Sequence, residues 1–174
     1  MSTPSLPVYL HLGTNLGDRR ANLQLALQQM ASLGIQIIRV SALYETDAWG
    51  IEDQPDFINL ALEARTDLLP NELLKQTQQI ELDMGRVRKR KWGERLIDID
   101  LLYYGSEIID EADLHLPHPG IPERNFVLIP MLEIAPDWLD PRRQKTIEEL
   151  YEASRDTGEV RWLESAEELL NWQQ

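Results

Sequence analysis

The chain has 174 residues, which is long enough to bury one sizeable core and too short for two full domains. Its formal net charge of −13 disfavours a general nucleic-acid or membrane binder, because both of those partners are themselves negative. The sequence has no cysteine, which excludes disulfides, thiolate metal sites and cysteine nucleophiles. It shows neither an N-terminal signal pattern nor an apolar run of about 18 residues, so we expect a cytoplasmic protein.

Hydrophobic patterning in the first half predicts strands alternating with helices. Residues 8–12 alternate as a strand, and a glycine-containing turn leads into a helix that Asp18 caps and Gly34 ends. The turn lacks the motifs of a dinucleotide-binding or P-loop, so an ordinary tight connection is favoured. Two more strands and a second helix are expected at residues 35–44, 57–66 and 70–85.

On the strand at residues 57–66, Phe57 and Asn59 share the less apolar face. An aromatic ring beside an amide suits a flat heterocycle with hydrogen-bonding edges, but a Phe at the margin of the core beside a solvated Asn fits equally well. On the following helix, Glu81 borders the apolar stripe, where a carboxylate near arginines is usually only their structural partner.

The segment RVRKRKWGERLIDID, residues 86–100, sets dense positive charge directly before two carboxylates. It holds 6 of the chain's 17 basic residues within ten positions, and this inversion of the overall charge indicates an anionic ligand. A strand is expected over residues 96–104, with Asp98 and Asp100 on one face and apolar residues on the other.

The two carboxylates, with Cα atoms about 6.6 Å apart, repel by roughly 2.5 kcal/mol at an effective dielectric near 20. A hard divalent cation such as Mg²⁺ removes this repulsion and also binds substrate phosphates. A solvated strand face produces the same D-x-D pattern, so the pair alone does not establish a metal site.

The second half contains a proline-rich connection and an acidic end. Residues 107–109 are expected to pair with the strand that carries Asp98. The sequence LPHPGIPERN places His118 and Arg124 on a stiff loop, although a structural role is the more common one for a single histidine.

A short helix bent or begun at Pro130 is expected over residues 126–134, and a strand over 159–163. The acidic end is expected to carry two helix-opening capping boxes and two anchoring tryptophans: Thr146 with Glu149, Ser165 with Glu168, and Trp162 and Trp172.

Five segments, in order and with compatible spacing, resemble one enzyme family: LGTNLGD, DQPDFIN, TQQIELDMGRVR, WGERLIDIDLLYYG and LPHPGIPERNFVLIPMLEIAPD. They cover roughly residues 8–137 and are similar to 6-hydroxymethyl-7,8-dihydropterin pyrophosphokinase of folate biosynthesis. The resemblance implies an ATP-dependent diphosphotransferase that passes the pyrophosphoryl group of ATP to the hydroxymethyl group of a reduced pterin and releases AMP.

The resemblance also implies the architecture. The fold class is α+β, a ferredoxin-like α/β sandwich with a mainly antiparallel sheet flanked by helices. Residues 1–174 would form a single pyrophosphokinase domain, in which residues 138–174 are an acidic helical extension packed on the body. We expect a monomer whose partners are the small molecules ATP and pterin, without a nucleic-acid or membrane partner.

The resemblance assigns residues to each part of the site. The catalytic set would be Arg86, Arg95, Asp98 and Asp100, and the two aspartates would bind two Mg²⁺ ions between ATP and the pterin hydroxyl. The pterin would be bound by Thr46, Ala48, Phe57, Asn59, Trp92 and Phe126. ATP would be bound by Gln78, Glu81, Arg88, Arg95, Leu101, His118 and Arg124.

A different interpretation of the basic segment is an RNA-binding module on the same topology. The sequence lacks the aromatic RNP1 signature of such modules, and two aspartates without metal would repel a phosphate backbone. The overall acidity of the chain argues in the same direction, so this alternative is disfavoured.

Overall fold

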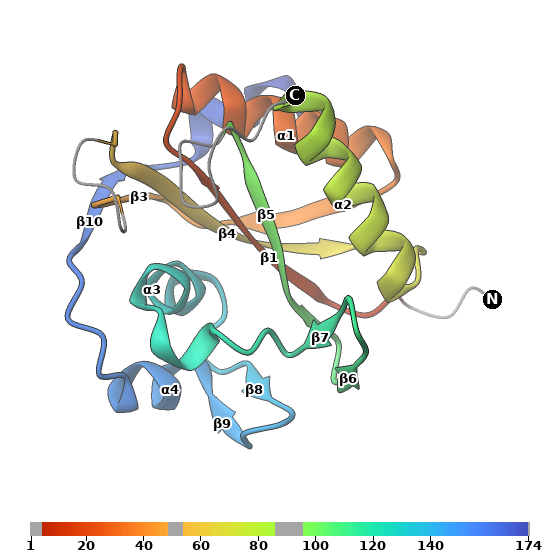
Figure 1. The fold of residues 1–174 in the computed structure, drawn as a ribbon, viewed down its shortest axis with the longest axis vertical. Helices are drawn as coiled ribbons and strands as arrows, with labels where there is room; N and C mark the ends of the chain where they lie inside the picture. The colour runs from red at the N-terminus through yellow and green to blue at the C-terminus, as the bar shows by residue number, and fades with distance from the viewer. Residues whose placement is uncertain (1–4, 49–53, 86–95, 174) are drawn as a thin grey trace.

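The computed structural model describes residues 5–48, 54–85 and 96–173. Within these ranges the chain forms a six-stranded antiparallel sheet with helices on both faces (Figure 1). One face is covered by α1 (Arg19–Ser32) and α2 (Pro70–Met84), and the other by α3 (Asn125–Ile134) and α4 (Ile147–Ala153). The predicted α+β sandwich is therefore confirmed.

The main sheet has the strand order β10-β3-β4-β1-β5, and β2 also pairs with β4. Its strands are β1 (Val8–Thr14), β2 (Gln36–Val40), β3 (Leu43–Thr46), β4 (Phe57–Arg65), β5 (Asp98–Tyr104) and β10 (Val160–Glu164). Without β10, this order and the two β-α-β units that build it match a ferredoxin-like fold. Smaller elements complete the described chain: β6 (Ile109–Asp110), β7 (His115–Leu116), η1 (Ile121–Glu123), β8 (Leu139–Asp140), β9 (Lys145–Thr146) and η2 (Glu167–Gln173).

The two helices of the first face form where the sequence predicts them. The Asp18 side chain accepts a hydrogen bond from the Ala21 backbone N–H and caps α1, whose buried residues include Leu23 and Leu27. Pro70 opens α2, which ends at Met84. Both helices pack on the alternate apolar residues of β1 and β4 to form the larger core. None of the helices in the described ranges is long and apolar enough to cross a membrane.

The prediction of one continuous strand over residues 35–44 is wrong, because β2 and β3 are separate strands. The Ser41 hydroxyl accepts a hydrogen bond from the Ala61 backbone N–H at 2.9 Å and donates to the Ala42 carbonyl. The Ala42 backbone N–H turns away and donates to the carboxylate of Glu133 on α3 at 3.0 Å. These bonds interrupt the strand ladder, so β2 and β3 pair one after the other with β4.

The predicted alternation of β5 holds for its first residues and changes at Leu102. Leu101 pairs with Leu10 and Tyr103 with Tyr9, so Leu102 is an extra residue on this strand, a β-bulge. The bulge puts Tyr103 into the smaller core under α3, whereas Tyr104 packs in the larger core. The strand also starts at Asp98, two residues later than expected.

Several smaller expectations need correction. Strand β6 pairs with β7 and not with β5. Helix α3 begins at Asn125, and Pro130 lies inside it. The helix expected after Ser165 is a 3-10 helix, η2. Trp162 does not anchor the acidic end, because it is 63% exposed, whereas the partly buried Trp172 packs against the larger core.

The segment after residue 137 contains strands as well as helices, and it joins the main sheet. Strand β10 pairs with β3, with Val160 opposite Thr46. The Thr146 and Glu149 capping box predicted for α4 is confirmed. Arg161 forms ion pairs with Asp47 at 3.2 Å and Asp56 at 3.3 Å, so β10 is tied to both ends of the connection between β3 and β4.

Candidate active site

The strand register brings an amide and a carboxylate to either side of a glycine. Gly13 of β1 pairs with Asn59 of β4 on one side and with Asp98 of β5 on the other. Residues that pair directly across strands lie on the same face, which here is the α3 face. Because glycine has no side chain, β1 itself places no side chain between the Asn59 amide and the Asp98 carboxylate.

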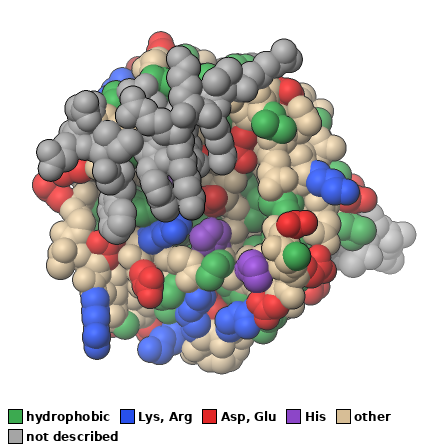
Figure 2. All heavy atoms as spheres, in the orientation of Figure 1, with side chains coloured by type: hydrophobic (Ala, Val, Ile, Leu, Met, Phe, Trp, Pro, Cys, Tyr) green, Lys and Arg blue, Asp and Glu red, His purple; other side chains and the backbone are tan. Residues whose placement is uncertain are grey.

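A cavity of about 310 Å³ opens beside this row and gathers six residues that the sequence predicts for metal and ATP: Gln78, Glu81, Asp98, Asp100, Leu101 and His118. Asp98 and Asp100 are both half-buried, as expected for one face of a strand whose other face is in the core. Figure 2 shows histidine, cationic and carboxylate side chains close together on the face in view. The described lining of the cavity itself combines carboxylates with two histidines, His115 and His118.

The cavity also has lining residues that the sequence interpretation did not assign: Leu74, Ile99, Asp113, Leu114, His115 and Pro119. Leu74 lies four residues before Gln78, on the same face of α2. Position 115 belongs to β7, a two-residue strand that has too little periodicity to be predicted.

Glu81 has a structural partner in the strand next to it. Its carboxylate accepts a hydrogen bond from the Ile99 backbone N–H at 3.3 Å, which links α2 to β5. Glu81 therefore has a structural hydrogen bond, as expected. The partner in this hydrogen bond is the Ile99 backbone and not an arginine.

His118 is held in a defined orientation. Its backbone N–H donates to the Leu102 carbonyl, and its Nδ1 accepts a hydrogen bond from the Gly120 backbone N–H at 3.0 Å. Burial, together with the nearby cations Arg124 and Arg143 and His115, lowers the pKa of His118 to about 4. The imidazole is therefore neutral at pH 7, and its Nε2–H remains as a donor.

Arg124 is placed by an aromatic ring and by a glycine. Its guanidinium lies 5.8 Å from the centroid of the Phe126 ring, at cation–π distance. A Cβ atom added at Gly120 would lie 2.7 Å from Arg124 Cζ. The missing side chain at position 120 therefore leaves the space that the guanidinium occupies.

The described residues predicted for the pterin lie near the end of β3 and around Asn59. The Asn59 Nδ2 donates to Thr46 Oγ1 at 2.9 Å, and Asn59 is only 3% exposed. The alternative interpretation, in which Asn59 is a solvated surface residue, is therefore wrong. The Asn59 Oδ1 lies 3.5 Å from the position of a Cβ on Gly13, and the Phe57 ring lies 3.8 Å from the same point. The half-buried Ala48 lies two residues beyond the end of β3.

Two carboxylates on one strand face fit a magnesium site, because Mg²⁺ is commonly held by one or two carboxylates with water and substrate phosphates. Over residues 5–48, 54–85 and 96–173, no group of three or more His, Cys, Asp or Glu residues is arranged to hold a metal. Arg86, Arg88, Trp92 and Arg95 lie outside these ranges.

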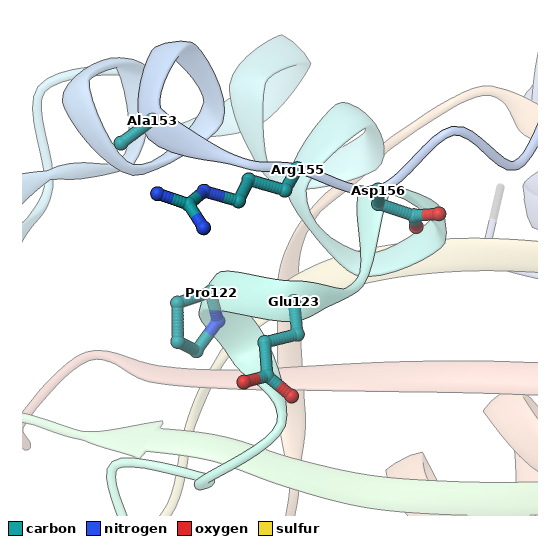
Figure 3. Close-up of a pocket in the computed structure, with 5 residues that line it drawn as sticks. All are labelled: Pro122, Glu123, Ala153, Arg155 and Asp156. Carbon is teal, nitrogen blue, oxygen red and sulfur yellow. The ribbon is translucent and has the colours of Figure 1, made fainter.

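A second cavity, of about 380 Å³, lies between η1 and the end of α4 and is lined by Pro122, Glu123, Ala153, Arg155 and Asp156 (Figure 3). The Arg155 side chain extends across it, while the Glu123 carboxylate points away from that guanidinium. Asp156 has a structural role, because its carboxylate accepts from the Asn125 backbone N–H at 2.8 Å at the start of α3. None of the predicted site residues lines this cavity.

Sequence comparison gives the family. A sequence profile described as 7,8-dihydro-6-hydroxymethylpterin-pyrophosphokinase (HPPK) matches residues 9–136. The chain belongs to the HPPK family. The matched region holds the main sheet apart from β10 and Val8 of β1, the helices α1, α2 and α3, and every described residue of the predicted site.

Individual HPPK relatives agree. The 2-amino-4-hydroxy-6-hydroxymethyldihydropteridine pyrophosphokinase of Aquifex aeolicus is 42% identical over 142 residues, which cover 82% of this chain and 88% of the relative. The enzyme of that name from Methylorubrum extorquens is 48% identical over 131 residues, which cover 74% and 82%.

The wild-type HPPK-DHPS crystal structure from Plasmodium falciparum has a TM-score of 0.69 and 18% identity, and the match covers 87% of this chain. The match spans 45% of that longer protein, and at this identity the likeness concerns the fold.

Proposed function

We propose that the chain transfers the diphosphoryl group of ATP to the hydroxymethyl group of 6-hydroxymethyl-7,8-dihydropterin, giving AMP and the pterin diphosphate. The observation that carries the site assignment is the row Asn59, Gly13 and Asp98 across three strands. Strands lie about 4.8 Å apart, so Asn59 and Asp98 are separated by about 10 Å of sheet surface. A pterin that is bound at the amide can direct its hydroxymethyl group toward the carboxylates.

The protein side chains bind and orient the two substrates in this proposal. Phe57 and Phe126 hold the pterin ring between them, while Asn59 reads its amide edge and Thr46 and Ala48 lie along it. The nucleotide lies along the cavity, where Gln78, Glu81, Leu101 and His118 contact it and Arg124 neutralises phosphate charge. From the resemblance alone we assign Arg86 and Arg95 to the catalytic set, Arg88 to ATP and Trp92 to the pterin.

Asp98 and Asp100 would hold the two Mg²⁺ ions. Such ions would supply charge neutralisation for the phosphates during an in-line displacement. Phosphoryl transfer asks for little covalent chemistry from the protein, so positioning by the cavity and exclusion of water are the main tasks of the side chains. We expect residues 1–174 to act as one domain, as a monomer, in the cytoplasm, with residues 138–174 packed on the body.

Product analysis tests this function. The protein, mixed with ATP, Mg²⁺ and the reduced hydroxymethylpterin, should release AMP and pterin diphosphate, and a chelator should stop the reaction. Formation of ADP, or AMP formation that does not require the pterin, would contradict the proposal. A salt-sensitive RNA complex without AMP formation would favour the RNA-binding alternative.

Replacing Asn59 with alanine should weaken pterin binding by about 10- to 100-fold, because a buried amide that pairs with a heterocycle edge is lost. Affinity for an ATP analogue should stay within about twofold of the wild type. Calorimetric titration of each substrate measures both constants. Asn71→Ala on the exposed side of α2 is the matched control, and equal pterin affinity in the Asn59 and Asn71 variants would remove Asn59 from the site.

Replacing Gly120 with alanine should weaken ATP binding by about 3- to 10-fold without changing stability. Gly120 has an ordinary backbone conformation, with φ at −80°, so alanine fits the backbone. The added methyl group instead displaces the Arg124 guanidinium, whose Nε would lie 2.7 Å from it.

Titrations in the Arg124→Ala background give the control for Gly120. There the second substitution should have no further effect, because the group that it displaces is already missing. Additive losses of ATP affinity would show that Gly120 acts by another route.

A further inference from the structure

His11 is a buried imidazole whose ring nitrogens make no hydrogen bond within the part of the chain that the structure describes. The residue lies in the middle of β1 and is 3% exposed. Neither its Nδ1 nor its Nε2 has a hydrogen-bond partner among the described residues. Buried polar groups are nearly always paired, because an unpaired one carries the full cost of losing water. An exception of this kind indicates a partner that the described residues do not supply.

The surroundings of His11 point to the pterin half of the site. It precedes Gly13 by two residues on the same face of β1, and across the strands it pairs with Ala61 and Asp100. Its Cε1 lies 3.5 Å from the position of a Cβ on Gly13, the point that Asn59 Oδ1 approaches at the same distance. His11 is not among the residues that line the nucleotide cavity.

The Phe126 ring packs against His11. The two ring centroids are 5.5 Å apart and the planes meet at 62°, so the two rings make an edge contact. A phenyl ring that turns to stack on a flat ligand would break this contact with the imidazole. Gly13, two residues further along β1, has no side chain that could fill the space left by the Phe126 ring.

The two ring nitrogens of His11 determine what it can bind. The Asn59 side chain and the Phe126 backbone approach the ring, but neither completes a hydrogen bond with it. A neutral imidazole carries one N–H donor and one nitrogen acceptor. A heterocycle with both N–H and imine nitrogen groups on its edges complements this pair.

We propose that His11 is a further pterin-binding residue, whose neutral imidazole hydrogen-bonds to the reduced pterin beside the Asn59 amide. This inference depends on the proposed function, because it takes the pterin as the ligand of this half of the site. It adds a residue of the central strand β1 to the pterin-binding set. The imidazole without a hydrogen bond then lowers the stability of the ligand-free protein, and pterin binding removes this penalty.

Three variants separate binding from structure. His11→Phe keeps a ring of similar size and removes both nitrogens, His11→Ala removes the ring, and His11→Gln returns a polar group. The probes are 6-hydroxymethyl-7,8-dihydropterin and a non-hydrolysable ATP analogue with Mg²⁺, each titrated by calorimetry. Melting temperatures of the ligand-free proteins are measured in parallel.

His11→Phe and His11→Ala should weaken pterin binding by about tenfold, the loss expected for one or two neutral hydrogen bonds, and leave ATP-analogue affinity within about twofold. His11→Gln should recover part of the pterin affinity. Ligand-free His11→Phe should melt at or above the wild-type temperature, because the unpaired polar group is gone.

Wild-type pterin affinity in His11→Phe would overturn the inference. It would also fail if pterin affinity, ATP affinity and melting temperature all fell together in all three variants, because that pattern indicates a structural role. Failure of the proposed function would give a different result. In that case the wild-type protein itself would neither bind the pterin nor release AMP.

Discussion

Alanine in place of Asp98 or Asp100 is expected to lower the rate of AMP formation by about 10³-fold or more, which corresponds to several kcal/mol of lost charge neutralisation. Both side chains are half-buried on the cavity side of β5, and the strand is fixed by apolar residues on its other face. Loss of one carboxylate also relieves the repulsion between the pair. The variants should therefore remain folded, with an unfolding free energy equal to the wild type or higher.

Single-turnover measurements over a range of Mg²⁺ concentrations, together with urea unfolding, check both parts of this expectation. Asparagine variants keep the shape and remove the charge, so they should lose nearly as much activity as the alanine variants. Asp67→Ala, on the exposed loop before α2, is the charge-matched control and should be fully active. Near-normal turnover of either the Asp98 or the Asp100 variant would remove the metal-site assignment.

Asp140→Ala should have the largest effect on stability, with a loss of about 3 kcal/mol or more in the free energy of unfolding. The Asp140 carboxylate is fully buried. It accepts hydrogen bonds from the Tyr103 hydroxyl at 2.8 Å, from Arg143 Nη1 at 2.7 Å and from the backbone N–H of Arg142 at 2.9 Å. Without it, a buried hydroxyl and a half-buried cation lose their partner.

Urea denaturation of Asp140→Ala measures this loss, and Asp137→Ala, an exposed neighbour on the same segment, should be close to neutral. Tyr103→Phe removes only one of the hydrogen bonds and should cost about 1 kcal/mol. The effect should extend to the site, because Arg143 also bonds the Pro119 carbonyl in the loop of His118. A loss below about 1 kcal/mol for Asp140→Ala would contradict the importance of this network.

The elements that the sequence predicts correctly are those determined by local pattern. Leu23 and Leu27 recur at helical spacing behind an Asp18 cap, and this pattern gives α1 directly. The alternation before Leu102 gives the face of β5 that carries Asp98. These signals depend on residues a few positions apart, which a single sequence records.

The elements that the sequence misses are set by distant contacts. The break between β2 and β3 depends on Glu133, 91 positions away from Ala42. The bulge at Leu102 is a matter of register with β1, and nothing in the alternating apolar run of β5 reveals it. A strand of two residues such as β6 has no period, so its partner could not be inferred.

The candidate site also contains features that local pattern predicts and features that depend on distant contacts. The carboxylate pair was recognisable because both members lie on one strand, and the assignment of Asn59 and Phe57 to one face also needed only alternation. The row through Gly13 needed the pairing of three strands, which sequence alone does not give. His11 is one polar residue in an apolar strand, and what distinguishes it is that its buried nitrogens have no hydrogen-bond partner among the described residues.

The pairing of β10 with β3 has a consequence for the order in which the molecule is completed. Arg161 and Asp47 are 114 positions apart, so the contact that secures the connection after β3 is among the most distant along the chain. A ribosome makes the N-terminal part first, and long-range pairing is slow to form. During synthesis, the part of the sheet next to Thr46 therefore stays an open edge until β10 has emerged.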